Sequence, residues 1–357
     1  MSKAAELAAL IGSQTAQTNR NMAYNGAMNI AQRSTSVTDI GASSGYFTVD
    51  RFKLAPNGTA GRLTMTQTAI TDLPGFANCL KLDCTTADTS IAAAEFLILS
   101  QYFEGQDLQR LKKGTSEAEP MTISFYVKGN AAATYTVEVY DADNNRSNNR
   151  RFSVTTSWTR VSLTYEGDTT GALDDDNASS LIVNIWLHAG SDSTSGTQNT
   201  AWQTLAAAER ANSDDTSFFD STDRTFFMTG FQMEIGETAT PFEHEDFATT
   251  LRKCSRYYTD IVRADNQTAH LVGYVQATTV ARFGFHVPMR TSPTITETNF
   301  VVLYAGGSEQ AITSVDDISQ DNQFVSFRAV VSGSLTVGQA VALYSAGAAS
   351  FAFDAEL

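Results

Sequence analysis

The chain has 357 residues, which suits two or three domains, and 42% of them are hydrophobic, enough for an extensive core. Its formal net charge of -15 argues against nucleic-acid binding, because a DNA or RNA footprint needs clustered Lys and Arg. Charged residues make up only 18% of the chain, a composition that favours strands and turns over long surface helices.

The first segment, residues 1–20, is predicted to be a short helix followed by a polar linker. Leu7, Leu10 and Ile11 lie on one stripe at helical spacing, and Ser2 can cap the helix. A helix of about ten residues is marginal alone in water. It therefore needs a partner, either its own copies in an oligomer or a surface on another protein; the alternative is a frayed terminus.

Residues 21–245 are predicted to form one large β domain. In Thr134–Tyr140, for example, Tyr135, Val137 and Val139 share one face of a strand. Strands joined by turn-rich links indicate an antiparallel sandwich, and about ten of them with long crossings favour a jelly roll. The expected strands are Tyr46–Leu54, Arg62–Ile70, Cys79–Cys84, Glu95–Tyr102, Met121–Lys128, Thr134–Tyr140, Arg151–Val154, Thr159–Tyr165, Leu181–His188 and Thr225–Ile235.

Helical signals inside this domain are few, with short helices expected in Gly105–Lys113 and Thr200–Asn212. Residues 246–260 are predicted to form a connecting helix with Asp246 as its N-cap. Residues 261–357 then form a second, smaller β-sandwich domain. Its expected strands are His270–Ala277, Val280–Val287, Thr294–Tyr304, Phe324–Val331 and Val341–Phe353. The fold class predicted for the whole chain is therefore all-β.

The three cysteines, Cys79, Cys84 and Cys254, are too few and too odd in number for a disulfide framework. Cys79 and Cys84 would point to opposite faces of a strand, so they cannot readily pair. The four histidines show no zinc-binding spacing. We expect buried free thiols in a protein made in a reducing cytoplasm, with no metal site and no cofactor.

No stretch approaches the roughly 18 apolar residues that a membrane span requires. Residues 1–11 are apolar for too short a run to be a secretory signal, and Glu6 interrupts that run. The sequence therefore predicts no membrane insertion and no export by a recognisable pathway.

Four segments together resemble bacteriophage tail-fibre and virion-appendage proteins that carry a carbohydrate-binding-module-like jelly roll. The most specific is GFQMEIGETATPFEHE at residues 230–245, followed by LRKCSRYY at 251–258. The others lie within residues 24–52, 84–114 and 124–171, in the same chain order. Each segment alone is weak, but four in series are specific. The similarity of residues 261–357 to small terminal β modules on such fibres is looser.

The resemblance implies a structural virion protein, a homotrimeric tail fibre or spike that attaches to the host cell surface after assembly in the host cytoplasm. Leu7, Leu10 and Ile11 would then attach the chain to other virion proteins of the tail or capsid. The distal loops at residues 306–310 and 316–323 are expected to touch a host receptor or glycan. Two alternatives stay open: a head fibre or capsid decoration, and a non-catalytic carbohydrate-binding module.

Sugar sites combine aromatic rings that stack on sugar faces with polar side chains that bond the hydroxyls. Trp202, in a loop rich in Ser, Thr and Gly, is the best candidate, and Trp158 and Tyr140 are further candidates for carbohydrate binding. Trp186, in an apolar strand, is expected in the core.

Two acidic turns could hold a cation or simply be solvated. Asp141–Ser147 resembles the first half of a calcium loop but lacks its glycine and terminal glutamate. Leu173–Asn177 is a second acidic segment, for which the alternatives are a solvated turn, a metal site or an intersubunit site. Both are interpreted as polar turns.

Two carboxylate pairs, Glu104 with Asp107 and Glu234 with Glu243, could be argued as acid–base pairs for glycoside cleavage. No spacing in the sequence diagnoses that geometry, and no nucleophile elbow or phosphate-binding glycine loop is present. The chain is therefore predicted not to be an enzyme, with no catalytic residue assigned.

Overall fold

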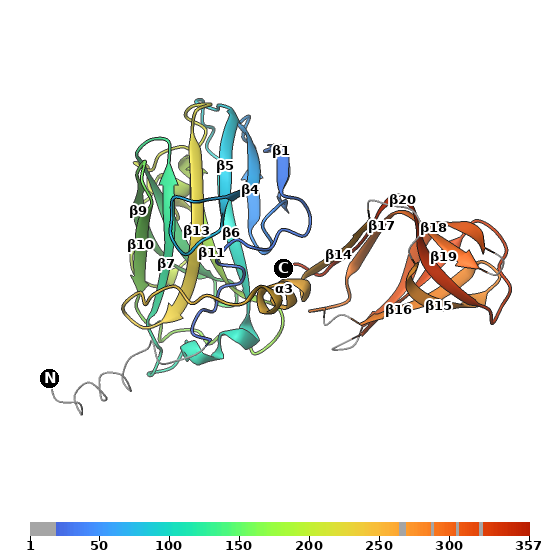
Figure 1. Ribbon diagram of the computed structural model, residues 1–357. Helices are drawn as coiled ribbons and strands as arrows, with labels where there is room; N and C mark the ends of the chain where they lie inside the picture. The colour runs from blue at the N-terminus through green and yellow to red at the C-terminus, as the bar shows by residue number, and fades with distance from the viewer. Residues whose placement is uncertain (1–18, 264–268, 287–288, 305–306, 321–323) are drawn as a thin grey trace. The chain divides into compact units, whose positions relative to one another are not determined.

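The computed structural model describes residues 19–263, 269–286, 289–304, 307–320 and 324–357. The chain divides into two compact units, Met1–Thr250 and Leu251–Leu357, which we call the sandwich unit and the barrel unit (Figure 1). The helix predicted in residues 1–20, with Leu7, Leu10 and Ile11, lies outside the described residues. Among the described residues, no helix is both long and apolar enough to span a membrane.

The sandwich unit consists of two antiparallel sheets. Sheet A has six strands in the order β1-β4-β5-β13-β7-β10, seen side by side in Figure 1. Its strands are β1 (Ser36–Ile40), β4 (Arg62–Ala69), β5 (Asn78–Thr86), β13 (Thr225–Ile235), β7 (Met121–Gly129) and β10 (Thr159–Tyr165).

Sheet B has seven strands in the order β12-β9-β8-β11-β6-β3-β2. Its strands are β12 (Gln203–Thr204), β9 (Arg146–Val154), β8 (Ala133–Asp141), β11 (Ser179–Ala189), β6 (Phe96–Glu104), β3 (Lys53–Asn57) and β2 (Gly45–Tyr46). The chain passes repeatedly from one sheet to the other, for example from β5 to β6 and from β6 to β7. Each sheet is thereby built from strands distant in sequence.

The core of the sandwich unit follows from side-chain alternation, since every second residue of a strand faces the opposite sheet. Phe125 of β7 packs edge-on against Phe152 of β9, with ring centroids 5.1 Å apart. Phe125 also stacks with Phe231 of β13 at 6.0 Å. The hydroxyl of the buried Tyr165 donates to the carbonyl oxygen of Val137, 3.1 Å away. The predicted antiparallel sandwich is confirmed.

The strand predicted at Tyr46–Leu54 is wrong. The chain forms β2, leaves the sheet at residues 47–52, and re-enters as β3. Arg51 adopts a left-handed backbone (φ 72°) and is fully buried. Its Nη2 donates to the carbonyl oxygen of Tyr102 at 2.8 Å. A buried arginine inside the strand-like pattern marks this break. The strands β1 and β12 were not predicted.

Residues 230–245 close the sandwich unit. Gly230 interrupts the pairing of β13 with β7 and has a φ of +64°, a conformation that favours glycine. Further on, the Glu243 carboxylate accepts hydrogen bonds from the backbone N–H groups of Asn19 and Asn21, at 2.9 and 2.8 Å. The segment thus ties the last strand to the first described residues.

Helices are short in the described part of the chain. The elements are η2 (Gly105–Asp107), η3 (Gln109–Leu111), α2 (Ser191–Thr194), η4 (Ala207–Glu209) and α3 (Phe247–Ser255). The predicted N-cap of α3 is confirmed, because Asp246 accepts the backbone N–H of Thr249 at 3.0 Å. The helix predicted over 246–260 nevertheless ends at Ser255, since Tyr258 already begins a strand.

The barrel unit is a closed sheet, not the second sandwich that was predicted. Strands β20, β15, β16, β19, β18 and β17 pair in turn, and β17 pairs back with β20. The elements are β14 (Tyr258–Arg263), β15 (Ala269–Ala277), β16 (Val280–His286), β17 (Thr294–Tyr304), β18 (Ser308–Gln320), β19 (Phe324–Val331) and β20 (Ala340–Asp354). Closure removes unpaired strand edges, and strand alternation alone does not distinguish it from an open sandwich.

Two features of the barrel unit were not anticipated. β14 pairs with β20, and β18 runs through most of the segments 306–310 and 316–323, where host-contact loops were predicted. Residues 306 and 321–323 lie outside the described part. The interior is aromatic, with Phe327 centroid distances of 5.7 Å to Phe283 and 5.1 Å to Phe351.

The three cysteines are buried and free, as predicted. Burial raises the pKa of the Cys79 thiol to about 12 and that of Cys84 to about 11. These thiols are therefore protonated and unreactive at neutral pH.

Candidate functional site

The outer face of sheet B presents side chains in rows that run across the strands. One row, which we call the aromatic row, aligns Tyr102 of β6, Ile182 of β11 and Tyr140 of β8. All three side chains are half-buried. Since neighbouring strands lie about 4.8 Å apart, the two tyrosines are separated by roughly 10 Å with Ile182 between them. The row therefore places two half-buried aromatic rings on one face of the sheet.

The next row is polar and includes Lys53 of β3, Ser100 of β6, Asn184 of β11 and Glu138 of β8. We call it the polar row. The Ser100 hydroxyl donates to Asn184 Oδ1 at 2.6 Å, and Asn184 Nδ2 donates to Glu138 Oε2 at 2.9 Å. The hydrogen bonds therefore form one chain across three strands.

Glu138 is the last acceptor in this series of hydrogen bonds and is fully buried. Arg210, from the segment that follows η4, donates from Nε to Oε1 and from Nη2 to Oε2, both at 2.7 Å. Trp186 adds an indole N–H bond to Oε2 at 3.0 Å. Burial disfavours the charged guanidinium, but the bonds to Glu138 outweigh it, so the pKa of Arg210 is raised. A bidentate pair of this kind fixes the plane of the guanidinium.

Cationic groups lie over the aromatic rings of this face. The Arg210 guanidinium carbon is 4.8 Å from the Trp186 ring centre and 5.6 Å from that of Tyr140. Lys53 Nζ lies 4.8 Å from the ring centre of Tyr102 and 5.6 Å from that of Tyr46. Such contacts add attraction and orient the rings.

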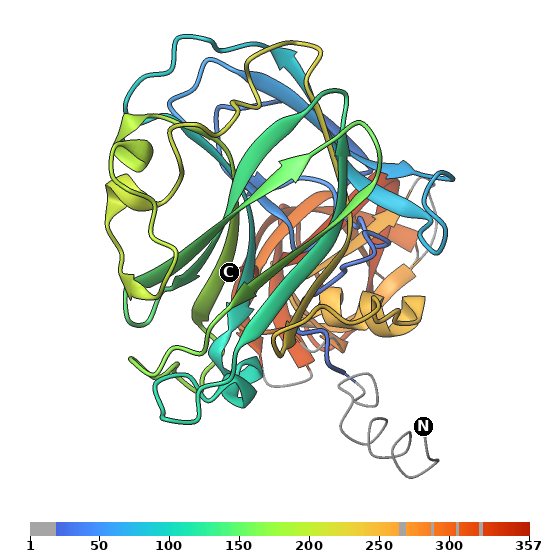
Figure 2. The same cartoon turned by 90° about the vertical axis from the view of Figure 1, so that its left-hand side faces the viewer.

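The segment of residues 190–217, which carries α2 and η4, runs alongside the strands of sheet B (Figure 2). Gln198 Nε2 donates to the Thr136 hydroxyl at 2.7 Å, and the Thr216 N–H donates to the carbonyl oxygen of Thr134 at 2.8 Å. These bonds hold the segment against β8, which is how Arg210 reaches Glu138.

The three aromatic residues predicted for carbohydrate binding are not brought together. Tyr140 lies on the aromatic row. Trp202 packs over the Lys113 ammonium, 5.3 Å from its ring centre, and its indole N–H donates to the carbonyl oxygen of Glu166 at 2.7 Å. Trp158 directly precedes β10 of sheet A, and its indole N–H donates to Asp72 Oδ1 at 3.0 Å.

Tyr102, Glu138 and Arg210 belong to the face but were not singled out from the sequence. A signal existed for Tyr102, because Ser100 and Tyr102 interrupt the apolar run of β6 at alternate positions. Arg210 sits in an irregular segment, where spacing carries no such information. Trp186 is buried as predicted, with 2% of its surface exposed.

The Asp141 turn is built around a lysine. Lys113 Nζ lies 2.5 Å from Asp141 Oδ2 and 3.0 Å from Asp168 Oδ2, and all three side chains are buried. Arg146 adds two bonds to Asp168, at 2.7 and 3.0 Å. Although burial raises the pKa of Asp168, its bonds to Arg146 and Lys113 bring it below its usual value. The Lys113 ammonium thus occupies the position between the carboxylates where a metal cation would bind. This favours the interpretation of the turn as a polar turn over that of a calcium loop.

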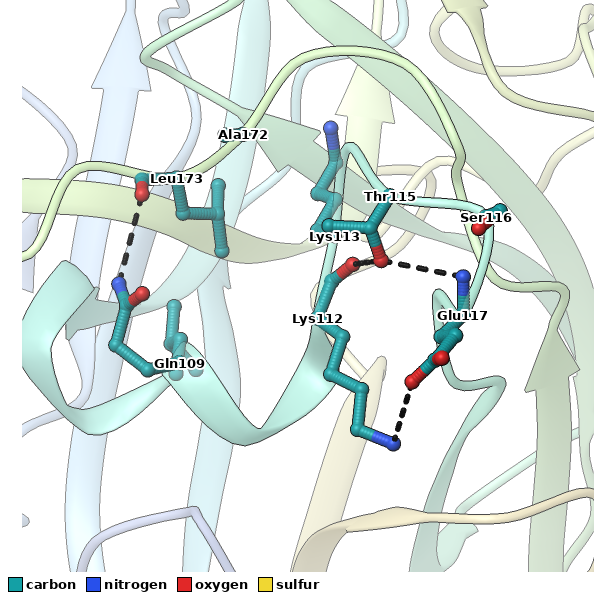
Figure 3. A pocket seen from close by; sticks show the side chains of 9 residues that line it. Gln109, Lys112, Lys113, Thr115, Ser116, Glu117, Ala172 and Leu173 are labelled. Atoms are coloured by element: carbon teal, nitrogen blue, oxygen red, sulfur yellow. Dashed lines mark hydrogen bonds and ion pairs between the residues drawn. The ribbon is translucent and has the colours of Figure 1, made fainter.

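A hollow of about 500 Å³ lies between η3 and the segment around Leu173. Figure 3 shows Lys112 and Lys113 pointing in opposite directions at this hollow. Lys112 Nζ pairs with Glu117 Oε2 at 3.8 Å. Asp174, in the second acidic turn, donates its backbone N–H to Asp143 Oδ2 at 2.9 Å. The second turn is therefore fastened to the first.

The carboxylates once considered as acid–base pairs are held by other protein groups. Glu234 is fully buried and accepts the Thr240 hydroxyl at 2.6 Å, while Glu243 caps the N-terminal segment as described above. Asp107 is bonded by the Tyr24 hydroxyl, and Glu104 by Gln106 Nε2 at 2.6 Å. Each of these carboxylates thus has a structural contact.

No protein-family model matches this sequence. No curated protein matches it either. Among solved structures, the chain is distantly similar to the enzymatically active domain of tailspike protein 4 of bacteriophage CBA120 (TM-score 0.32, 9% identity), over 61% of this chain and 22% of that one. It therefore spans less than a quarter of that tailspike chain.

Distant similarity also extends to carbohydrate-binding modules. One is a CBM4 module (TM-score 0.30, 12% identity, 59% of this chain and 98% of that one). Another is the family 11 module from Clostridium thermocellum, in complex with a β-1,3-1,4-mixed-linked tetrasaccharide (TM-score 0.28, 11% identity, 58% and 97%).

Proposed function

We propose that the outer face of sheet B binds a carbohydrate, within a trimeric phage tail fibre or spike that attaches to the host cell surface. One observation carries the binding proposal: Tyr102 and Tyr140 flank Ile182 beside the hydrogen-bonded polar row. Flat rings can stack on the apolar faces of sugars, and the half-buried Lys53 and Arg210 can donate to their hydroxyls.

The face suits binding because its polar groups are held in place before a ligand arrives. Glu138 holds Arg210 through two bonds, and Arg210 in turn lies against Tyr140 and Trp186. Side chains that are already ordered lose little conformational entropy on binding. Two rings roughly 10 Å apart suit successive units of an extended chain of sugars.

The virion part of the proposal rests on the sequence resemblance, above all on residues 230–258. In this proposal the sandwich unit is a jelly roll that binds glycan without cleaving it. Leu7, Leu10 and Ile11 attach the homotrimer to other virion proteins. Mounting on the head as a fibre or decoration is the nearest alternative, and a free non-catalytic carbohydrate-binding module is the next.

The binding face can be tested on a glycan array with the full chain and with the double variant Tyr102→Ala, Tyr140→Ala. Loss of two stacking rings should weaken binding by about 2 kcal/mol or more, a factor of roughly 30. The matched control is Trp158→Ala, which removes a half-buried aromatic residue just before β10 of sheet A. Glycan binding that is unchanged in the double variant, or lost only in the control, would exclude this face.

The virion assignment needs a separate measurement, which is labelling of phage particles with an antibody to this chain. Signal at the tail supports a fibre or spike, and signal at the head supports the decoration. Particles without signal would exclude both and leave a free binding module.

A further inference from the structure

A second group of side chains meets inside the sandwich unit, apart from the residues of the aromatic and polar rows. Among the described residues, Asp88, Glu95 and His188 bring three potential metal-ligand atoms within 4.8 Å of one another. Asp88 and Glu95 lie in the connection between β5 and β6, and His188 lies near the end of β11. Only 6%, 9% and 2% of their respective surfaces are exposed.

One ring nitrogen of His188 has a hydrogen-bond partner and the other has none that the structure describes. Its Nδ1 lies 2.8 Å from the Ser217 hydroxyl oxygen, which also accepts the backbone N–H of Phe219 at 3.0 Å. Its Nε2 is buried and has no hydrogen-bond partner within the part of the chain that the structure describes. Glu95 Oε2 is 3.7 Å from Nε2, beyond hydrogen-bond length. A buried polar atom left unpaired is costly, so this geometry calls for a ligand.

The two carboxylates are held by hydrogen bonds that leave some of their acceptor capacity unused. Asp88 Oδ2 accepts the Thr59 hydroxyl and the Ala60 backbone N–H, both at 2.8 Å. Glu95 Oε2 accepts the Ala92 backbone N–H at 2.9 Å. A carboxylate has about four lone-pair sites, so acceptor capacity remains. Outer contacts of this type orient the ligands of metal ions.

Protonation also suits a metal. Burial lowers the pKa of His188, although Asp88 and Glu95 act in the opposite sense. Burial would raise the pKa of Asp88, but the hydrogen bonds from Thr59, Ala60 and Ser90 lower it overall.

We propose that Asp88, Glu95 and His188 bind one divalent transition-metal ion of the zinc type. One imidazole nitrogen and two carboxylate oxygens match the ligands of Zn²⁺, with water in the fourth position. Calcium instead takes six to eight oxygen ligands. A pocket of about 80 Å³, lined in part by His188 and Ser217, lies beside the imidazole.

The bound ion would stabilise the sandwich unit. It would join the β5–β6 connection to the end of β11, beside Ser217 and Phe219. This inference does not depend on glycan binding. The sequence predicted no metal site, since His188 is far along the chain from Asp88 and Glu95 and the three form no recognisable spacing.

Calorimetric titration of the chelator-treated full chain with ZnCl₂, and its melting temperature, test the proposal. We expect one Zn²⁺ per chain and a Tm increase of a few degrees at saturating zinc, because a ligand that binds only the folded state stabilises it. CaCl₂ should give neither effect. His188→Asn keeps an amide near the position of Nδ1 but removes Nε2. It should weaken Zn²⁺ binding by about 100-fold or more, since loss of even an outer contact costs roughly 10–100-fold.

The matched control is His286→Asn, which removes an exposed histidine of the barrel unit and should bind zinc normally. If His188→Asn fails to fold, ¹⁵N NMR of histidine-labelled wild type resolves the question, because the chain has only four imidazoles. Zinc should then shift one Nε2 signal, which persists in Asn variants of His244, His270 and His286. Absence of zinc binding in wild type, or binding that survives in His188→Asn, would overturn the proposal.

Discussion

At the scale of single residues, buried charges are placed where they organise the structure. Glu138 is fully buried, yet it accepts four hydrogen bonds from three side chains and so escapes the cost of an unpaired charge. Removing one partner of such a pair is far more costly than the net value of the pair itself. Glu138 therefore sets the geometry of Arg210 more than it adds to stability.

Asp168 makes stability depend on pH in a direction that can be worked out. Its pKa is lowered in the folded state, so the unfolded chain binds more protons as the solution becomes acidic. Its contribution is complete above the unfolded pKa of about 3.9 and is lost as pH falls through the lower folded pKa. In denaturant unfolding between pH 3 and pH 7, Asp168→Asn should show a weaker pH dependence than wild type.

The control for this measurement is Asp174→Asn, which changes an exposed carboxylate of the neighbouring turn and should retain the wild-type profile. Parallel profiles for wild type and Asp168→Asn would show that the contacts of Asp168 with Arg146 and Lys113 do not contribute to acid stability.

At the scale of elements, the segment at residues 230–245 has a structural explanation that its sequence did not reveal. Gly230 produces the irregularity that shifts the register of β13 on β7. Glu234 then accepts a hydrogen bond from the hydroxyl of Thr240. Glu243 accepts hydrogen bonds from two N–H groups of the N-terminal segment. A strand, a bulge and a return loop act as one closing element.

Gly230→Ala should destabilise the sandwich unit for two reasons. The φ of +64° strains any Cβ, and that Cβ would lie 2.8 Å from the Phe76 ring and 2.9 Å from the Tyr126 ring. We expect a loss of about 2–4 kcal/mol, from backbone strain of roughly 1–3 kcal/mol plus the overlap. Urea unfolding followed by tryptophan fluorescence measures it, because all three tryptophans belong to this unit.

Gly75→Ala is the matched control. Gly75 also has a positive φ, of +93°, but its added Cβ would meet only His244 Nε2 at an ordinary 3.8 Å. This variant should lose only the part of the unfolding free energy that comes from backbone strain. Equal losses of unfolding free energy in the two variants would mean that the aromatic rings move aside for the new methyl group at no measurable cost.

At the scale of the whole molecule, two units with separate cores share one chain. The sandwich unit buries side chains between two sheets, whereas the barrel unit closes one sheet on itself. β20 is decisive for the barrel, because its residues pair with β14, β15 and β17. Phe351 and Phe353, near its end, are fully buried.

Deletion of residues 349–357 should therefore unfold the barrel unit and leave the sandwich unit folded. The deletion removes the pairing of β20 with β14 and two core phenylalanines together. Limited proteolysis followed by mass spectrometry should yield a resistant fragment that ends near residue 250 and keeps its glycan binding. A resistant barrel, or cooperative loss of both units, would contradict this expectation.

Much of the fold was accessible from the sequence because alternation is a local signal. Strands such as β7, β8 and β11 were predicted within one or two residues of their observed ends. The strand break at residues 47–52 was missed because the burial of Arg51 depends on distant contacts such as its bond to Tyr102. The long strand β18 was missed because Ser308–Gln320 has a polar composition. Of the candidate face, only Tyr140 was anticipated, because strand order decides which side chains become neighbours.

By itself, the sequence determined the all-β class, the faces of individual strands, the free cysteines and the cap of α3. These features depend on period-two alternation and on contacts within a few residues. Only the tertiary structure decided that the second unit closes as a barrel, that Arg210 reaches Glu138, and that Asp88, Glu95 and His188 meet. Those outcomes depend on pairings between distant segments, which are set by the packing of the whole core and leave no local pattern.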